Sequence, residues 1–188
     1  MTGAVDGAHV AVGRGVRVRH KLPGDAFDDF LWRRDPEIAR YDAAKPLSTT
    51  FGEFLRRFEN DLSTIDPRRR LFALDDEQGT HIGNIMYYNA DERRLAAEFG
   101  MVIGRPDYRG RGLGREAAMA FLHHLFVTEQ FQAIYLHTLE WNERARRCFE
   151  HAGFLPAARV RRRAEWFLRM EAPREGWLEW YQRERSDY

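Results

Sequence analysis

The chain has 188 residues and a mass of 22.2 kDa, and its 30 basic and 29 acidic side chains give a formal net charge of +1. This balance excludes a protein coated uniformly with one sign of charge. A hydrophobic fraction of 44% is ordinary for a globular protein, and the length predicts a single domain. Only Lys21 and Lys45 are lysines, so arginine, which binds planar anions well, supplies nearly all of the positive charge.

The single cysteine, Cys148, excludes an internal disulfide and a cysteine-based zinc site. No apolar run approaches the roughly 18 residues of a membrane span, because the richest one is interrupted by His123 and His124. Residues 1–14 lack the apolar run of a signal peptide and are predicted to be flexible, followed by one domain over residues 15–188. We expect a cytoplasmic protein with no membrane partner.

The first third of the chain predicts one strand and three helices. Val and Arg alternate over residues 16–19, which is the period of a half-exposed strand. A helix is expected after the turn at residues 23–25, and a second short one begins at Pro36 behind an Asp35 cap. A third helix, beginning near residue 48 or 49 and ending before Asp66, carries apolar side chains on one face: Phe51, Phe54, Leu55, Phe58 and Leu62.

The centre of the chain changes to short apolar runs separated by polar turns. Residues 71–74, 82–88 and 95–103 predict a meander of three antiparallel strands. Residues 112–128 then show apolar side chains at four-residue steps, which is typical of a helix packed on a sheet. This helix is expected to cross over to a parallel strand at residues 133–138.

The last part predicts a helix and the terminal strands. Residues 142–152 form the expected helix, which Gly153 ends, and strand-like alternation resumes from Phe154. Residues 176–183 are predicted to be the last strand. With no internal repeat and no long linker, the fold class is mixed α/β around one sheet.

The most informative segment, residues 103–117, runs from a strand end through a glycine-rich loop into a helix. Glycines let a backbone approach a ligand closely, and the start of a helix favours negative charge. Arg109 and Arg111 add cations that could bind a pyrophosphate. The alternative is an ordinary glycine turn with solvated arginines.

Spacing excludes two common nucleotide-binding loops. No Gly-Lys-Ser/Thr follows, so the segment is not the phosphate loop of NTPases. The third glycine of the dinucleotide fingerprint would fall at Arg115, and the loop follows a meander strand. The pattern that remains is Arg109-x-x-Gly112-x-Gly114.

This pattern resembles the coenzyme A pyrophosphate motif of the GNAT N-acetyltransferases, Arg/Gln-x-x-Gly-x-Gly/Ala. Asn142 and Ala145, followed by Gly153 and Phe154, are similar to a second segment of that family. Residues 32–41 resemble the acceptor-side helices of the branch that contains the ribosomal-protein alanine N-acetyltransferases. The resemblance spans residues 16–183 and implies the GNAT fold, with acetyl transfer from acetyl-CoA directly to an amine.

The resemblance also implies the residues that bind the cofactor. Main-chain groups of Met101, Val102 and Ile103 would pair with the pantetheine chain and polarise the thioester carbonyl, although these residues could also be ordinary core residues. The pyrophosphate would be bound by the loop and the helix start, which comprise Arg109, Gly110, Arg111, Gly112, Leu113 and Gly114. The helix cap Asn142 would make a further contact with the cofactor.

Glu98 is the candidate general base, acting directly or through water, because it lies on the strand that leads to the thioester. The alternative is a cross-strand ion pair at the surface. Phe149 occupies the position where many relatives place a tyrosine acid, but a thiolate can leave without one. The neighbouring Cys148 is expected to lie in the core with no covalent role.

The acceptor is expected between the early helices and the meander, where carboxylates and aromatic faces could bind a cation. The candidates are Trp32, Asp35, Tyr41 and Tyr87, with Asp42 and Tyr88 beside them. A protein N-terminus, a polyamine and an aminosugar all fit such a lining. The branch resemblance favours a peptide α-amine.

Two other functions were weighed. A nucleic-acid-binding module is suggested by the arginine cluster at residues 159–163, but the balanced net charge argues against a nucleic-acid partner. A non-catalytic acetyl-CoA sensor keeps the fold and is suggested by Phe149. His81 and His137 lie in predicted strands and are expected to be structural, with a role as proton carriers as the alternative. No metal site is predicted. A homodimer is left open because Trp166, Trp177 and Trp180 suit either a core or a dimer surface.

Overall fold

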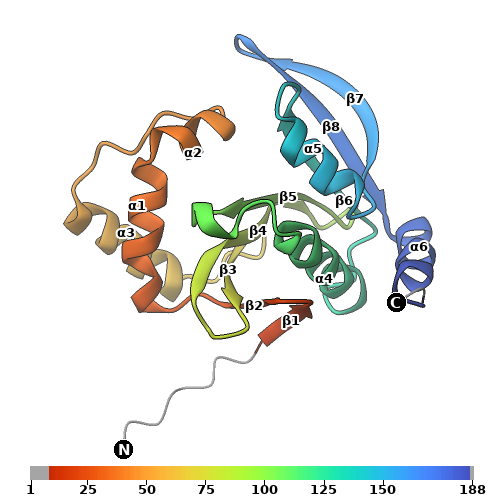
Figure 1. Cartoon of the computed structure of the whole chain (residues 1–188), viewed down its shortest axis with the longest axis horizontal. Coiled ribbons are helices and arrows are strands. Elements are labelled where there is room, and N and C mark those ends of the chain that lie inside the picture. Colours follow the sequence, from red (N-terminus) through yellow and green to blue (C-terminus); the bar gives the residue numbers. More distant parts are fainter. Residues whose placement is uncertain (1–8, 187–188) are drawn as a thin grey trace, which may run out of the picture.

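An eight-stranded sheet runs through the computed structural model, which describes residues 9–186. The strands lie side by side in the order β1-β2-β3-β4-β5-β6-β8-β7 (Figure 1). Their bounds are β1 His9–Gly13, β2 Val16–His20, β3 Arg70–Asp76, β4 His81–Asp91, β5 Ala96–Ile103, β6 Ala133–Leu139, β7 Leu155–Arg162 and β8 Glu165–Pro173. Neighbouring strands are antiparallel except β5 and β6, which are parallel, as the crossover pattern predicted.

Helices cover both faces of this sheet (Figure 1). Their bounds are α1 Ala26–Arg34, α2 Pro36–Tyr41, α3 Phe51–Ser63, α4 Leu113–Val127, α5 Glu143–Glu150 and α6 Arg174–Ser186. The helices α4, α5 and α6 share one face, and α1 and α3 lie over the other. The sheet therefore separates α1 and α3 from α4, the helix that follows the glycine-rich loop.

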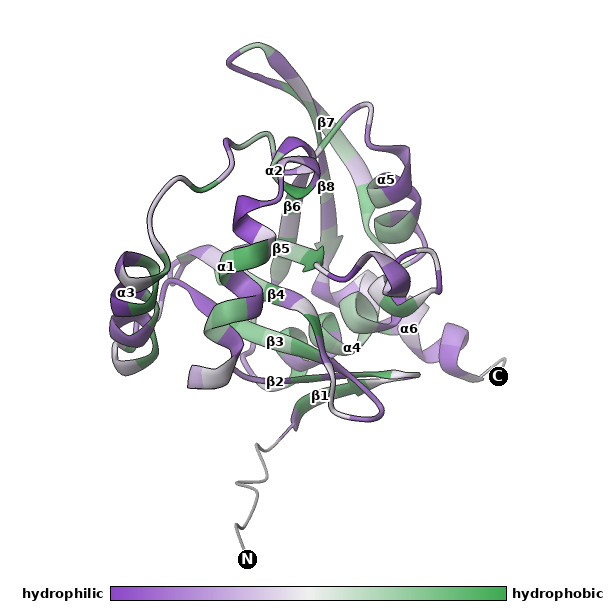
Figure 2. Ribbon diagram, turned by 60° about the vertical axis from the view of Figure 1, so that its left-hand side comes forward, coloured by the Kyte–Doolittle hydropathy of each residue, from purple (hydrophilic) through white to green (hydrophobic). Residues whose placement is uncertain are grey.

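Alternation along the strands decides which side chains reach the α4 face. In β5, Phe99 points to that face and packs against Phe121 of α4 and Phe154. Figure 2 shows the hydrophobic residues gathered on the inner strands and on α4. A smaller aromatic cluster, which includes Phe30 of α1 and Phe54 of α3, holds these two helices together on the opposite face.

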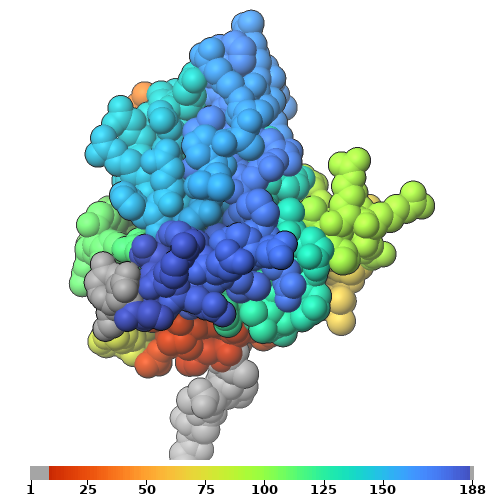
Figure 3. Space-filling model, turned by 90° about the vertical axis from the view of Figure 1, so that its right-hand side faces the viewer, coloured from red at the N-terminus to blue at the C-terminus, as the bar shows by residue number. Residues whose placement is uncertain are grey.

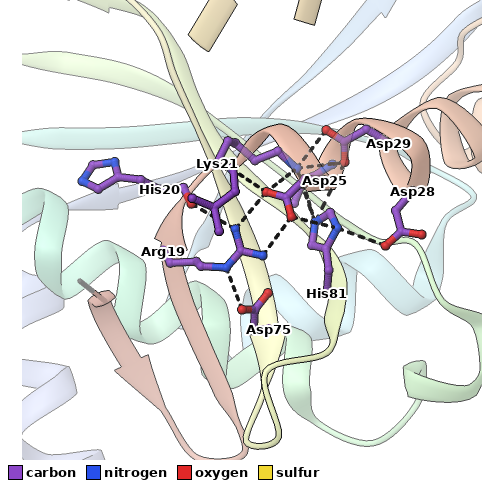
Figure 4. A network of polar contacts seen from close by, with 10 residues as sticks. Arg19, His20, Lys21, Asp25, Asp28, Asp29, Asp75 and His81 are labelled. Carbon is purple, nitrogen blue, oxygen red and sulfur yellow. Dashed lines mark hydrogen bonds and ion pairs between the residues drawn. The ribbon is translucent and has the colours of Figure 1, made fainter. Parts of the chain in front are cut away.

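A buried network of charges connects α1 to the sheet (Figure 4). Arg19 of β2 makes two bonds of 2.8 Å to Asp25 and one of 2.7 Å to Asp75. The Lys21 ammonium group lies 2.8 Å from an Asp29 oxygen. Burial by itself would raise the pKa of Asp25, but the bonds from Arg19 and from the Leu22 N–H lower it. The network fixes the position of α1 over β2, β3 and β4.

The strands β5 and β6 separate partway along their length. In the part of the chain that the structure describes, they pair only at Ala96, Ala97 and Glu98 of β5. From Phe99 to the end of β5, the strand keeps its partner β4 but has no β6 ladder. This separation, called the splay below, leaves main-chain donors and acceptors of β5 free on one side, immediately before the glycine-rich loop.

Two predicted elements were wrong. Residues 176–183, predicted as a strand, lie in α6, because Trp177, Trp180 and Tyr181 repeat at helical spacing on the face that meets the core. Trp177 is only 2% exposed. Residues 9–13, within the segment predicted to be flexible, form β1 instead, and residues 1–8 lie outside the described part.

Candidate active site

Two glycines in left-handed conformations shape the loop between β5 and α4. Gly110 has φ of 73° and Gly112, the N-cap of α4, has φ of 81°. A Cβ at either position would meet nothing within 4 Å, so conformation explains these glycines better than close packing does. No side chain of the described residues caps α4 at Gly112, so its first N–H groups, beginning at Leu113, remain available to an anion.

The side chain of Arg109 is turned back toward the protein. Its guanidinium group donates to the carbonyl oxygens of Ile103 at 3.1 Å and Gly104 at 3.2 Å, and to Glu37 of α2 at 3.1 Å. These bonds brace the loop against the end of β5. Arg111 is exposed and lies over the ring of Tyr108 at 5.2 Å, so it is the loop arginine that is open to a ligand.

Close packing brings the start of α4 onto β5 and α5. A Cβ at Gly114 would lie 3.2 Å from the Cys148 sulfur and 3.3 Å from the Met101 methyl. Met101 and Ile103 are half-buried and pack on the core beneath α4, whereas Val102 alternates to the other face. The main chain of these three residues lies along the splay.

Glu98 is the last residue of β5 that pairs with β6. Its side chain is buried, with 3% exposed, and accepts a hydrogen bond of 3.0 Å from Asn89. His137 Nδ1 lies 2.7 Å from Glu98 Oε1, and Arg162 lies 3.9 Å from that same oxygen. The cross-strand contact of Glu98 is therefore a buried one with His137 beside the splay, and not the surface ion pair of the alternative interpretation.

Two further titratable groups belong to this side of the site: Tyr88, which lies beside Glu98, and Asp42, whose charge acts on Tyr88. Tyr88 is the cross-strand partner of Glu98 on β4, and burial, followed by the charge of Glu98 and a hydrogen bond to it, raises the pKa of Tyr88 well above its usual value. Asp42, at the end of α2, keeps a solvent-exposed surface. Surrounding protein nevertheless raises the pKa of Asp42, an effect that Arg33 opposes.

Three of the four predicted acceptor residues, Trp32, Asp35 and Tyr87, have structural partners within the protein. Trp32 is 9% exposed and lies against His81, with ring centroids 4.7 Å apart. Asp35 caps α2 by accepting bonds of 2.7 and 3.1 Å from main-chain N–H groups. Tyr87 is 3% exposed, on the α4 face of the sheet against Phe131.

The fourth, Tyr41, belongs to a contact that joins α2 to the turn after β6. The ring of Tyr41 lies 5.5 Å from that of Trp141, with Arg40 over Trp141 at 5.0 Å and Arg144 over Tyr41 at 4.8 Å. We call these four residues, Arg40, Tyr41, Trp141 and Arg144, the clasp.

Asn142, which follows Trp141 in the sequence, caps α5 as predicted. Its side-chain oxygen accepts a hydrogen bond of 3.2 Å from the Ala145 N–H.

A family model decides the identity. Residues 17–155 match the model of the acetyltransferase (GNAT) domain, which is most of the chain. The chain belongs to the GNAT acetyltransferase family. The predicted fold class, the N-acetyltransferase activity and acetyl-CoA as co-substrate are thereby confirmed at the level of the family. None of the curated proteins matches the sequence.

Solved structures support the GNAT fold. A spermidine N-acetyltransferase from Vibrio cholerae in complex with CoA and spermine superimposes with a TM-score of 0.79 and 22% identity, covering 88% of this chain and 99% of that one. The dodecameric structure of a spermidine N-acetyltransferase from Vibrio cholerae, in an intermediate state, gives 0.71 and 21%, covering 88% and 97%. At this identity the likeness establishes the fold alone.

At α5 the GNAT chain has phenylalanine in place of the tyrosine acid and a thiol that is not reactive. Phe149 packs edge-on against Phe99 and against Phe154. Burial raises the pKa of the Cys148 thiol to about 11, so it is protonated and unreactive at neutral pH. Both observations favour direct transfer of the acetyl group.

Sequence reasoning missed the side chains that link the acceptor side of this acetyltransferase together. These side chains are Trp141, Arg162, which the sequence shows only as part of an arginine cluster, and His137, which is expected to be structural. Arg162 lies on the β7–β8 hairpin, which Figure 3 shows standing out from the body above α6. No local pattern marks these residues, because their partners lie far away in the sequence. Trp141 contacts Arg40 and Tyr41 of α2, and His137 and Arg162 approach Glu98 of β5.

Residues 9–186 contain no group of three or more histidine, cysteine, aspartate or glutamate side chains placed to hold a metal ion. None of the helices formed by these residues is both long and apolar enough to cross a membrane.

Proposed function

We propose that this acetyltransferase moves the acetyl group of acetyl-CoA to a primary amine that reaches the splay beside Glu98. The observation that carries the proposal is the end of β5–β6 pairing at Glu98, followed directly by a loop with left-handed Gly110 and Gly112. A free strand edge suits the pantetheine chain, and an uncapped helix start suits the pyrophosphate.

The cofactor is assigned to the main chain more than to side chains. N–H and C=O groups of Met101, Val102 and Ile103 pair with the pantetheine, and an N–H among them polarises the thioester carbonyl. The N–H groups at Leu113 and Gly114 bind the pyrophosphate, assisted by Arg111. Arg109 holds the loop in place through its bonds to Ile103 and Gly104.

The chemistry then needs few protein groups. The neutral amine attacks the thioester carbon, a C–N bond forms and the C–S bond breaks, and CoA leaves as a thiolate. Glu98 accepts the proton that the amine releases, directly or through water. With an ordinary thiol pKa near 8.5, the thiolate leaves without an acid, so Phe149 in the acid position is compatible with turnover.

The acceptor class that we propose is a small cationic amine. Asp42 and Glu98 place acidic groups on the acceptor side, and the hydroxyl of Tyr88 lies between strand and helix near both. The branch resemblance favours a peptide α-amine, whereas a Vibrio cholerae relative is named for spermidine and was solved with spermine. Self-association is also proposed, since a relative is dodecameric, and sedimentation velocity tests it.

The test measures release of the free CoA thiol from acetyl-CoA in the presence of spermidine, an alanine-initiated peptide or glucosamine. The proposal predicts turnover with at least one of them and none in Gly112→Glu. A second candidate, a non-catalytic acetyl-CoA-binding module, is favoured by the fully bonded state of Glu98 and by Phe149. Stabilisation by acetyl-CoA without CoA release for any amine would support that module and overturn the transferase.

A further inference from the structure

His137 makes the only side-chain bridge to Glu98 from β6 among the described residues. It lies two residues beyond Tyr135, the last β6 residue paired with β5, so its side chain spans the beginning of the splay. Both side chains are buried, with 6% and 4% exposed, and Nδ1 is 2.7 Å from Oε1. An ionised carboxylate only accepts hydrogen bonds, so Nδ1 carries the proton.

Arg162 approaches both members of this pair. One of its nitrogens lies 3.1 Å from His137 Nδ1 and 3.0 Å from Nε2, and another lies 3.9 Å from Glu98. A guanidinium group is always cationic and cannot accept a hydrogen bond. Arg162 therefore places a permanent positive charge beside both side chains.

Every element around the pair contributes a polar or charged group. These are Asp42 at the end of α2, Tyr88 and Asn89 of β4, Tyr135 of β6, Arg162 of β7 and Arg169 of β8. Asn89 holds the second oxygen, Oε2, at 3.0 Å. Together, His137 and Asn89 leave the carboxylate a single orientation across the splay.

We propose that His137 is a positioning residue for acetyl transfer, which holds the Glu98 carboxylate ionised and oriented toward the incoming amine. The inference rests on the proposed function, in which Glu98 receives the proton of the amine. His137 touches neither substrate in this account and acts only through Glu98. If His137 only linked β5 to β6, its replacement would leave the acidic limb of the pH profile in place.

The experiment compares His137→Leu, which removes the donor, with His137→Asn, whose amide can replace Nδ1–H. With the amine found in the acceptor screen, we expect His137→Leu to lower kcat at least on the order of tenfold, within the range of general-base effects. The acidic limb of the kcat/KM profile should move to higher pH, because a donor that favours the ionised carboxylate is lost. His137→Asn should recover most of both changes.

Three further measurements make the outcome decisive. The KM for acetyl-CoA and the stabilisation by acetyl-CoA should stay unchanged in both variants. His124→Leu, a histidine of α4 remote from the splay, should leave the profile in place. An unmoved acidic limb in His137→Leu, or loss of acetyl-CoA binding along with activity, would overturn the positioning role.

Failure of the proposed function can be distinguished from failure of the role of His137. If the wild type releases no CoA with any amine, the transferase itself is wrong. If turnover persists but Glu98→Gln keeps the acidic limb, Glu98 is not the base and the role of His137 falls with it.

Discussion

The indole ring of Trp32 lies directly against the backbone of Gly104. A Cβ built on Gly104 would come within 2.0 Å of Trp32 Cδ2, far closer than carbon atoms can pack. Gly104 directly follows β5 and its carbonyl accepts a hydrogen bond from Arg109, so this contact joins α1 to the start of the cofactor loop. The contact gives Trp32, which is predicted to bind the acceptor, a part in shaping that loop.

Gly104→Ala should therefore be destabilised by about 1–3 kcal/mol, the usual cost of overpacking, and should weaken acetyl-CoA binding. Urea unfolding and the KM for acetyl-CoA measure the two effects. Gly176→Ala is the matched control, because a Cβ there meets nothing within 4 Å. Equal stability of the two variants would show that the indole moves aside at little cost.

The glycine-rich loop and the meander could be predicted because their signals are local. Left-handed backbone favours glycine, and the period of apolar residues indicates strand or helix directly. Gly112, at φ of 81°, is such a position. The weak β1 strand could not be predicted, because its stability comes from pairing with β2 and from α4, whose Glu116 backbone lies against Gly13.

Which residues line the acceptor site is decided by contacts between segments that are distant in the sequence. Tyr87 and Tyr88 are neighbours, but successive residues of a strand point to opposite faces, so Tyr87 enters the core and Tyr88 faces Glu98. Which of the two reaches the site is decided by the register of β4 against β5. A sequence shows the alternation without showing which face carries the site.

Asp35→Ala should lose about 1 kcal/mol of stability, because two N–H groups at the start of α2 lose their acceptor. Asp35→Asn keeps a capping oxygen and should stay near the wild type. Thermal unfolding of both variants checks the cap, and the KM for the amine checks the predicted acceptor role. A raised KM in both variants with unchanged stability would restore Asp35 to the acceptor site.

The clasp predicts a difference between two tryptophans of similar exposure. Trp141→Ala removes the contacts with Arg40 and Tyr41 and should raise the KM for the amine, since α2 is released from the turn after β6. Trp166→Ala loses the contact with Arg159 on the β7–β8 hairpin and should leave that KM unchanged. Each variant should cost about 0.5–1 kcal/mol of stability, as exposed cation–π contacts do. Equal KM values for the amine in the two variants, measured by steady-state kinetics, would argue against a role of the clasp in amine binding.

Stability should fall as the pH drops below neutrality. Burial lowers the pKa of His124 below its usual 6.5, although Glu129 partly opposes the shift. The unfolded chain then binds a proton more readily than the folded one, so stability from this group is present above pH 6.5 and is lost as the pH falls below it. The melting temperature should drop less in His124→Gln than in the wild type when the pH is lowered from about 7.5 to about 5.5, a range that spans the ordinary pKa of histidine. An identical drop would exclude His124 as a source.

The most direct test of the account is the melting temperature with and without saturating acetyl-CoA. A ligand at 100 times its Kd adds about 2.7 kcal/mol to the folded state, which corresponds to a rise of about 5–10 °C for a chain of this size. The account predicts this rise in the wild type and in Gly176→Glu, and its loss in Gly112→Glu, where a carboxylate and a strained backbone would meet the pyrophosphate. No rise in the wild type, or an equal rise in Gly112→Glu, would contradict the assignment of the splay and its glycine-rich loop as the acetyl-CoA site.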